Sequence, residues 1–177
     1  MNLALIGFRG TGKTTVARIL AERLAWSWID ADVELERRAG RTIKQIFATG
    51  GEQAFRDLEA TLVNELAART STVLAFGGGV VLREENRAAL KAGCVTAWLT
   101  ASATTLLARI EADPTTSERR PNLTASGGLA EIEHLLTVRE PLYRDCADCS
   151  VATDDRSPES IADEILARLR TRIDMTK

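Results

Sequence analysis

The sequence predicts an α/β fold in which a parallel β-sheet is covered by helices on both faces. Short apolar segments of strand character alternate along the chain with longer segments of helical period, an order typical of parallel sheets. A glycine-rich turn joins the first strand to the first helix. The chain has 177 residues, of which 45% are hydrophobic and 27% charged, and this is ordinary globular composition. We therefore expect a single domain over residues 1–177.

Five short segments rich in apolar residues are the predicted strands. They are residues 3–6, a short segment ending at 28–29, and residues 73–76, 95–99 and 149–153. Each is bounded by a segment of helical period or by turn residues, so the connections between strands are crossovers. Crossovers of this kind join parallel strands.

The helices are predicted from apolar residues at helical spacing and from capping residues. The first helix buries the face that holds Val16, Ile19, Leu20 and Leu24. Helices are also expected over residues 52–69, 83–93 and 102–110, after residue 128, and from residue 158 onward. Gly93 ends one of them, and Ser102 and Ser157 are expected N-caps, the latter followed by Pro158 at the first helical position.

Residues 112–128 have no apolar period and contain Pro, Ser, Thr and Gly throughout. A segment of this length is unusual inside a compact domain, and such segments are often lids over active sites. We therefore expect a mobile lid at about residues 112–128.

The charge balance excludes several classes of partner. Lys and Arg total 23 and Asp and Glu total 25, which gives a net charge of -2. Non-specific binding to nucleic acid or to acidic membranes requires a clear positive excess. The chain also lacks an apolar run long enough to span a bilayer and a secretory signal at its start. We expect a cytoplasmic monomer without nucleic-acid or membrane partners.

Residues 7–14, GFRGTGKT, match the pattern G-x-x-x-x-G-K-[ST] in the strand–turn–helix context that it requires. Backbone N–H groups in such a turn converge on an anion, and the helix N-terminus adds the positive end of a dipole. Lys13 is expected to reach the β- and γ-phosphates, and the Thr14 hydroxyl to ligate Mg²⁺. The alternative is a turn that only joins strand to helix. The full pattern in context favours a nucleotide phosphate site.

Asp30 and Asp32 lie at the end of the second predicted strand, at the edge where ligands bind in parallel sheets. Two residues apart on an extended segment, they are expected to point the same way. One carboxylate is then available for metal-bound water and the other for an acceptor hydroxyl. The alternative is that Asp32 is the N-cap of the helix that follows.

Further polar and glycine-rich signals are spread along the chain. Arg56 has Glu59 three residues on, which on its own indicates a surface ion pair on a helix. The glycines at 77–79 directly follow a buried strand and are expected to let a small molecule lie against bare backbone. Arg119, Arg120 and Arg139 concentrate positive charge in and after the lid, where arginine can neutralise a transferring phosphoryl group.

The cysteines Cys94, Cys146 and Cys149 do not suggest a disulfide framework. Cys146 and Cys149 form a C-x-x-C, which is compatible with a redox pair or half of a zinc site. A redox motif of this kind normally opens a helix after a strand, whereas this one precedes a strand. We expect two small buried hydrophobic residues instead.

Taken together, six motifs resemble those of the shikimate kinases, P-loop enzymes related to the nucleoside-monophosphate kinases. The motifs are G-x-x-G-x-G-K-T (7–14), D-x-D (30–32), G-E-x-x-F-R-x-x-E (51–59), G-G-G (77–79), R-P (120–121) and R-x-P-L-Y (139–143). They occur in the family's order and span essentially the whole chain. The resemblance implies a three-layer α/β/α P-loop fold with a five-stranded parallel sheet, a mobile lid and a substrate-binding region at about residues 32–60.

The resemblance also implies roles for individual residues. ATP would be bound by Gly10, Thr11, Gly12, Lys13, Thr14, Thr15, Arg120, Arg109 and Arg156, the last two flanking the adenine. Shikimate would be bound by Asp32, Arg56, Gly77, Gly78, Gly79 and Arg139, with both arginines on its carboxylate. Lys13, Asp32 and Arg120 would be catalytic, and Mg²⁺ would be held by Thr14 and, through water, by Asp30.

The implied reaction is ATP-dependent phosphorylation of the shikimate 3-hydroxyl, a step of the shikimate pathway to aromatic amino acids. Two alternatives remain at this point. One is a kinase for another small polyol acid such as gluconate, against which the glycine triplet and the Arg56–Arg139 pair argue. The other is a nucleotide-binding regulatory module without catalysis, which would have no use for Asp32.

Overall fold

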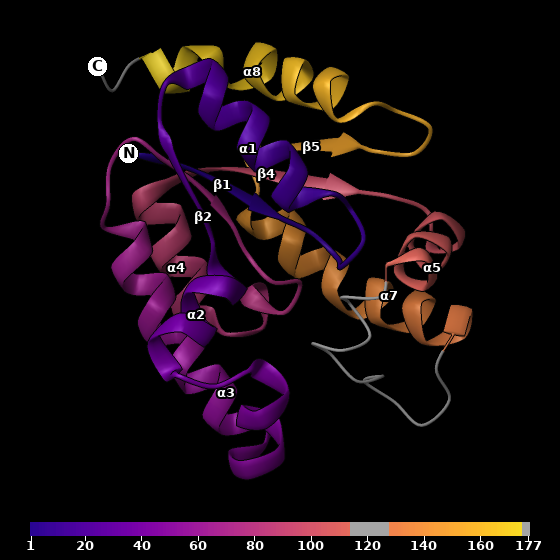
Figure 1. Cartoon of the computed structure of the whole chain (residues 1–177). Coiled ribbons are helices and arrows are strands. Elements are labelled where there is room, and N and C mark those ends of the chain that lie inside the picture. The colour runs from indigo at the N-terminus through magenta and orange to yellow at the C-terminus, as the bar shows by residue number, and fades with distance from the viewer. Residues whose placement is uncertain (114–127, 175–177) are drawn as a thin grey trace.

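The computed structural model describes residues 1–113 and 128–174, which form a five-stranded sheet between two layers of helices (Figure 1). The strands are β1 (Asn2–Ile6), β2 (Ser27–Asp30), β3 (Thr72–Ala75), β4 (Cys94–Thr100) and β5 (Cys149–Ala152). They lie in the order β2-β3-β1-β4-β5, and every adjacent pair is parallel. The predicted α/β fold with a five-stranded parallel sheet is confirmed.

The helices cover both faces of the sheet. They are α1 (Lys13–Leu24), α2 (Ala31–Ala39), α3 (Ile43–Ala67), α4 (Glu84–Gly93), α5 (Ala103–Ala112), α7 (Gly128–Cys146) and α8 (Pro158–Asp174), with the 3₁₀ turn η1 (Val80–Leu82). Figure 1 shows α1 and α8 on one side of the sheet and α3, α4 and α7 on the other. The connections are therefore crossovers, as parallel strands require.

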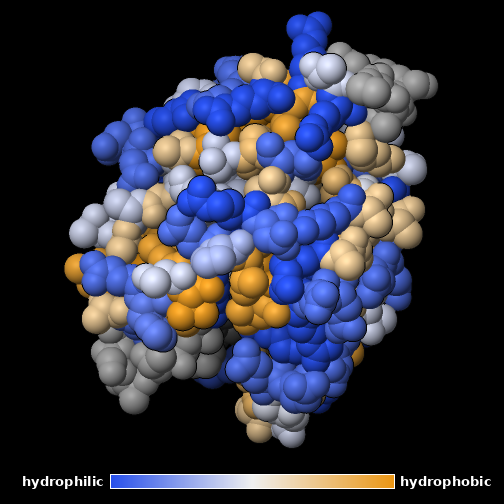
Figure 2. All heavy atoms as spheres, turned by 180° about the vertical axis from the view of Figure 1, so that it is seen from behind, coloured by the Kyte–Doolittle hydropathy of each residue, from blue (hydrophilic) through white to orange (hydrophobic). Residues whose placement is uncertain are grey.

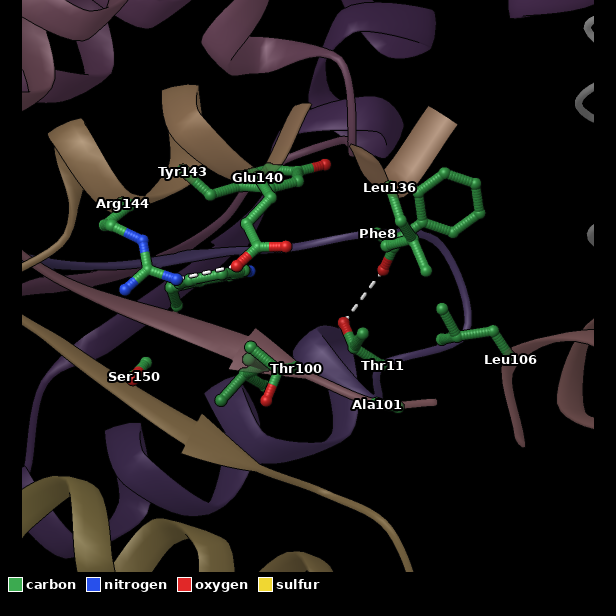
Figure 3. Close-up of a pocket in the computed structure, with 12 residues that line it drawn as sticks. Phe8, Thr11, Thr100, Ala101, Leu106, Leu136, Glu140, Tyr143, Arg144 and Ser150 are labelled. Atoms are coloured by element: carbon green, nitrogen blue, oxygen red, sulfur yellow. Dashed lines mark hydrogen bonds and ion pairs between the residues drawn. The ribbon is translucent and has the colours of Figure 1, made fainter. Parts of the chain in front are cut away.

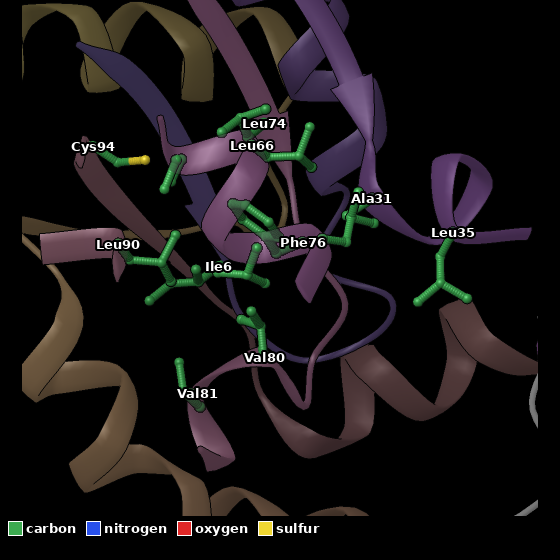
Figure 4. Packing of buried hydrophobic residues seen from close by; sticks show 14 of the residues in the cluster. Ile6, Ala31, Leu35, Leu66, Leu74, Phe76, Val80, Val81, Leu90 and Cys94 are labelled. Carbon is green, nitrogen blue, oxygen red and sulfur yellow. The ribbon is translucent and has the colours of Figure 1, made fainter. Parts of the chain in front are cut away.

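The side chains of β1, the central strand, point alternately to the two faces of the sheet and divide the core into two parts. Leu3 and Leu5 pack with α1 and α8, whereas Ala4 and Ile6 pack with α3, α4 and α7. All four are fully buried, because successive side chains of a strand point to opposite faces and helices cover both. Figure 4 shows Ile6 in the second of these clusters, with Leu74, Phe76 and Val80 around it.

Helix α3 begins earlier than the sequence predicts. Its second part, from residue 52, is confirmed, but residues 43–50 are also helical and begin with a capping box between Thr42 and Gln45. Gly51, with φ 69° and ψ -173°, breaks the helical path between the two parts. The adjacent glycines conceal the first part, since such a pair normally ends a helix.

The expected caps are present. The Ser102 side chain accepts a hydrogen bond from the Thr105 amide at the start of α5. Ser157 accepts one from the Ser160 amide, with Pro158 as the first residue of α8. These caps fix where each helix leaves the carboxyl edge of the sheet.

The proposed lid, including Arg119 and Arg120, lies outside the described residues apart from its ends at α5 and α7. No described helix is both long and apolar enough to cross a membrane. Figure 2, a view from behind, shows hydrophilic residues over most of that face and hydrophobic ones in separate areas.

Candidate functional site

The glycine-rich turn between β1 and α1, residues 7–14, is called the P-loop below. Gly7 and Gly12 have positive φ values of 137° and 83°. A Cβ at Gly7 would overlap the carbonyl oxygen of Leu99 on β4, whereas one at Gly12 would meet nothing within 4 Å. Glycine is required at position 7 by lack of space and at position 12 by backbone conformation. At position 7 the space for a side chain is thus filled by protein atoms of β4 and not by a ligand.

The start of α1 is open to an anion. Its N-cap, Gly12, provides no side-chain hydrogen bond, and its first turn contains no acidic residue. The amides of a first helical turn lack partners within the helix and carry the positive end of the helix dipole. An anion at this position is therefore favoured by both hydrogen bonding and charge.

Lys13, the first residue of α1, folds back across the P-loop. Its Nζ donates to the carbonyl oxygens of Gly7 at 2.9 Å and Phe8 at 2.7 Å. It also lines the cavity described below. The ammonium group is thus held at the mouth of the loop, where it adds a positive charge to the amide donors.

Thr14 and Asp30 bring two oxygen groups together beside the P-loop. The Thr14 hydroxyl donates to Asp30 Oδ2 at 2.7 Å. Asp30 Oδ1 accepts from the amides of Asp32 and Val33, which makes Asp30 the N-cap of α2. A hydroxyl and a carboxylate are hard oxygen ligands of the kind that Mg²⁺ prefers, so this pair fits the ion.

The alternative role for Asp32 as a helix cap is wrong, because Asp30 is the cap and Asp32 lies inside α2. The extended segment assumed for both residues ends at Asp30, where β2 ends. Both carboxylates nevertheless line the same cavity.

That cavity, of about 500 Å³, lies at the carboxyl edge of the sheet. Residues from the P-loop and the start of α1 line it, as do residues at or just after the ends of β2 and β3: Arg9, Gly10, Gly12, Lys13, Thr14, Thr15, Asp30, Asp32, Phe76, Gly77 and Gly78. Trp28, Val33, Ala75, Arg109 and Asp113 complete it. Among the lining residues that the sequence did not predict are Arg9, at a variable position of the P-loop pattern, and Trp28, which lies within β2 and is 41% exposed.

The segment Gly77–Gly79, called the glycine turn, follows β3. A Cβ at Gly78 would lie 3.3–3.4 Å from backbone atoms of Gly7, Phe8 and Arg9. One at Gly79 would overlap the guanidinium of Arg56. The expectation that these glycines leave room for a ligand is corrected in part: Gly77 and Gly78 line the cavity, but much of the missing side-chain volume is filled by protein.

Arg56 and Arg139 flank the glycine turn from α3 and α7. Arg56 pairs with Glu59 at 2.7 Å and with Glu52 at 3.2 Å, and its side chain is only 12% exposed. The pair with Glu59 is therefore present but buried, not on the surface as its spacing alone indicates. A buried ion pair contributes little to the stability of a fold. We therefore interpret the pair with Glu59 as one that holds the Arg56 guanidinium in place.

Arg139 is 7% exposed, and its Nη1 donates to the Gly78 carbonyl oxygen at 3.4 Å. Its guanidinium also lies over the ring of Phe8, 5.7 Å from the centroid. The structure therefore brings both predicted carboxylate-binding arginines to one turn, beside the P-loop.

Arg109 and Arg156 are placed differently. Arg109 lines the cavity and donates to the Gly10 carbonyl at 3.3 Å and to the Thr153 carbonyl at 2.8 Å. Arg156 donates to the carbonyls of Ala152 and Ser160 and pairs with Glu164, and it is not among the described residues that line the cavity. Arg120 lies outside the described residues.

Cys146 ends α7 and Cys149 begins β5, the order that the sequence indicates. Burial raises the pKa of both thiols to about 11. Such thiols are protonated at neutral pH and are poor nucleophiles, which favours the interpretation as small packing residues.

Comparison with known proteins decides the family. The family model described as shikimate kinase matches residues 9–170 of the chain. The chain belongs to the shikimate kinase family. Relatives described as shikimate kinases include one from Pseudomonas syringae pv. syringae, 42% identical over 95% of each chain. Another, from Rhodopirellula baltica, is 40% identical over 93% of this chain and 88% of the relative.

Solved structures of the shikimate kinase family agree. A shikimate kinase from Acinetobacter baumannii in complex with shikimate is 36% identical, with a TM-score of 0.90 over 97% of this chain and 93% of that one. The shikimate kinase of Aquifex aeolicus has a TM-score of 0.82 at 33% identity. A gluconokinase from Sinorhizobium meliloti, at 16% identity and a TM-score of 0.59, shares the fold alone. The suspected resemblance is confirmed: the chain is a kinase of this family.

Proposed function

We propose that the chain transfers the γ-phosphoryl group of ATP to the 3-hydroxyl of shikimate, giving ADP and shikimate 3-phosphate. The observation that carries the proposal is the meeting of the P-loop with two arginines at the glycine turn, Arg139 buried and Arg56 largely so. One element suits a triphosphate, and the other suits a small planar carboxylate. The chain's membership of the shikimate kinase family names the acid.

The donor side of the site is the P-loop with Thr15 and Asp30. Amides from Gly10 to Thr15 and the Lys13 ammonium hold the phosphates, while Arg109 and Arg156 flank the adenine. The side chains of Thr14 and Asp30, hydrogen-bonded at 2.7 Å, would hold Mg²⁺, with Asp30 acting through water. The ion supplies positive charge that offsets the charge on the phosphates.

The acceptor side consists of Asp32, Arg56, the glycine turn and Arg139. The contacts of Arg56 with Glu52 and Glu59 use three of its five N–H donors among the described residues, so two are left for a ligand. Arg56 and Arg139 bind the carboxylate of shikimate, and Asp32 orients its 3-hydroxyl and accepts the proton. By the family resemblance, Arg120 would neutralise charge on the phosphates. Because phosphoryl transfer needs little covalent help, the residues act chiefly by positioning and by neutralising charge.

We further propose that the chain acts as a cytoplasmic monomer of one domain, with residues 32–60 as the substrate-binding region and residues 112–128 as the lid. The mixed, mainly hydrophilic face in Figure 2 supports the monomer. Light scattering of the purified protein tests it, and a dimer mass would contradict it.

A coupled ADP-release assay tests the proposed reaction. Purified protein with Mg²⁺ and ATP is supplied with shikimate, with gluconate or with no acceptor. We expect ADP release with shikimate well above both other reactions, and shikimate 3-phosphate by mass spectrometry. Equal rates with gluconate would contradict the acceptor, and equal rates without any acceptor would contradict the kinase.

A further inference from the structure

Tyr143, the only tyrosine of the chain, lies on α7 and is fully buried. Its hydroxyl donates to the carbonyl oxygen of Gly78 at 2.5 Å. The same oxygen accepts a longer bond of 3.4 Å from Arg139, one turn earlier on the helix. Two side chains of α7 therefore hold one carbonyl of the glycine turn, and the phenol makes the shorter contact.

The other two carbonyls of the turn are also engaged. Gly77 accepts from the Val80 amide and Gly79 from the Leu82 amide, both at 3.1 Å. With all three carbonyls bonded within the protein, the turn can offer a ligand its N–H groups. The N–H groups of the turn suit a ligand that supplies acceptor oxygens, as a carboxylate or hydroxyl does.

The bond to Tyr143 sets the direction of one of these donors. The described chain has no cis peptide bond, and in a trans peptide the C=O and the N–H point opposite ways. Fixing the Gly78 carbonyl toward α7 therefore points the Gly79 N–H away from α7. Rotation of this peptide would redirect the Gly79 donor and leave the buried Gly78 carbonyl without its bonds to α7.

The phenol is itself held by the sheet. Its ring stacks on Trp98 of β4, with centroids 5.6 Å apart and planes 19° apart. Figure 3 shows Tyr143 and Glu140 extending from α7 on one side of a second cavity, with Thr11 and Thr100 on the other. The hydroxyl is thus placed relative to the same strands that position the P-loop.

We propose that Tyr143 is a positioning residue for the acceptor: its hydroxyl orients the Gly78–Gly79 peptide so that the turn donates N–H groups to acceptor oxygens. Gly78 also lies against the backbone of Gly7 and Arg9, so the orientation of this peptide sets the acceptor relative to the phosphates. The inference rests on the proposed function, because the acceptor that it positions is shikimate.

Steady-state kinetics of Tyr143→Phe test it, since the ring and its stacking remain and only the hydroxyl is lost. We expect the KM for shikimate to rise about fivefold to tenfold, the KM for ATP to stay within about twofold, and kcat to change less than the KM for shikimate. Thr72→Val is the matched control, because it removes another buried hydroxyl bonded to a carbonyl, that of Thr70, at the opposite end of β3. It should lower stability without raising the KM for shikimate.

A spectroscopic test uses the single tyrosine. Incorporation of 3-fluorotyrosine gives one ¹⁹F resonance, which reports on the Gly78 carbonyl. Shikimate should shift this resonance, and Mg·ADP alone should shift it less. An unchanged KM for shikimate in Tyr143→Phe, or no shift with shikimate, overturns the inference while leaving the proposed function intact. If the wild type does not phosphorylate shikimate, both fail.

Discussion

The P-loop, the phosphate-binding part of the donor side, is built from neighbouring residues, whereas the acceptor side is assembled from segments far apart in the chain. The P-loop lies between one strand and the next helix, and its shape follows from glycine dihedrals and a helix N-terminus. On the acceptor side, Arg56, the glycine turn and Arg139 come from α3, the end of β3 and α7. The P-loop therefore depends on local geometry, and the acceptor side depends on tertiary packing.

This difference predicts different responses to substitution. A change in the P-loop should abolish transfer to every acceptor, because it acts on the phosphates. A change on the acceptor side should leave ATP binding intact and alter only the use of shikimate. The predictions below test this division.

Lys13→Ala should have the largest effect, lowering kcat/KM by about a thousandfold or more. The variant lacks the ammonium group that neutralises negative charge on the transferring phosphoryl group. The fold should survive, since the Lys13 amine contacts loop carbonyls and not the core. Activity and thermal unfolding of the purified variant check both statements. Lys91→Ala, which removes a surface partner of Asp145, is the control and should stay active. A folded Lys13→Ala variant with normal turnover would refute the P-loop assignment.

Gly79→Ala should lower kcat/KM for shikimate about tenfold to a hundredfold, because the new methyl displaces the Arg56 guanidinium. The KM for ATP should hardly change. A double-mutant cycle sharpens the test: in an Arg56→Ala background the methyl has nothing to displace, so Gly79→Ala should add little. Additive losses would mean that the two residues act separately.

Asp30→Asn separates the two roles of Asp30. Asparagine is as good an N-cap as aspartate, so the stability of the fold should change little. The apparent affinity for Mg²⁺ should fall on the order of tenfold, because the carboxylate beside Thr14 loses its charge. Titration of activity and of ADP binding with Mg²⁺ measures this. Loss of stability with unchanged Mg²⁺ dependence would assign Asp30 to capping alone.

Cys146→Ser with Cys149→Ser should have the smallest effect, with kinase activity within about threefold of the wild type. Because burial raises the pKa of both thiols to about 11, alkylation should be slow at neutral pH and accelerate toward pH 11. These raised values also stabilise the fold below the ordinary pKa of 9.0, and that contribution is lost as the pH rises through 11. Rapid labelling at pH 7, or stoichiometric zinc by elemental analysis, would contradict this account.

The same division explains what the sequence could predict. The strand and helix alternation predicts the sheet, and the P-loop pattern predicts the phosphate site, because both depend on neighbouring residues. The N-cap of α2 is harder to predict, because aspartate at either position, 30 or 32, is a good cap. The choice between them depends on where β2 ends. The first half of α3 has a capping box, Thr42 to Gln45, as its signal, but the adjacent Gly50 and Gly51, which normally end a helix, conceal its continuity with the second half.

On the acceptor side, local sequence patterns do not predict burial or contacts between distant segments. The spacing of Arg56 and Glu59 predicts an ion pair but not its burial, which comes from packing of α3 beside the glycine turn. Tyr143 belongs to the R-x-P-L-Y motif, yet its bond to Gly78 appears only when α7 is placed over the sheet. The family resemblance implied that Arg56 and Arg139 bind the carboxylate, but it implied no role for Tyr143.

The most direct test of the central claim, that the acceptor side recognises a carboxylate through Arg56 and Arg139, uses an acceptor whose carboxylate is replaced by a neutral hydroxymethyl group. The measured quantity is kcat/KM for shikimate divided by kcat/KM for this analogue. Charge-assisted hydrogen bonds of about 1.5–3 kcal/mol predict a ratio on the order of tenfold to a hundredfold in the wild type. In Arg56→Ala the ratio should fall well below the wild-type value, because one of the two guanidinium groups that recognise the charge is gone and only Arg139 remains. An equal ratio in both enzymes would contradict the claim and leave Arg56 as only the buried partner of Glu59.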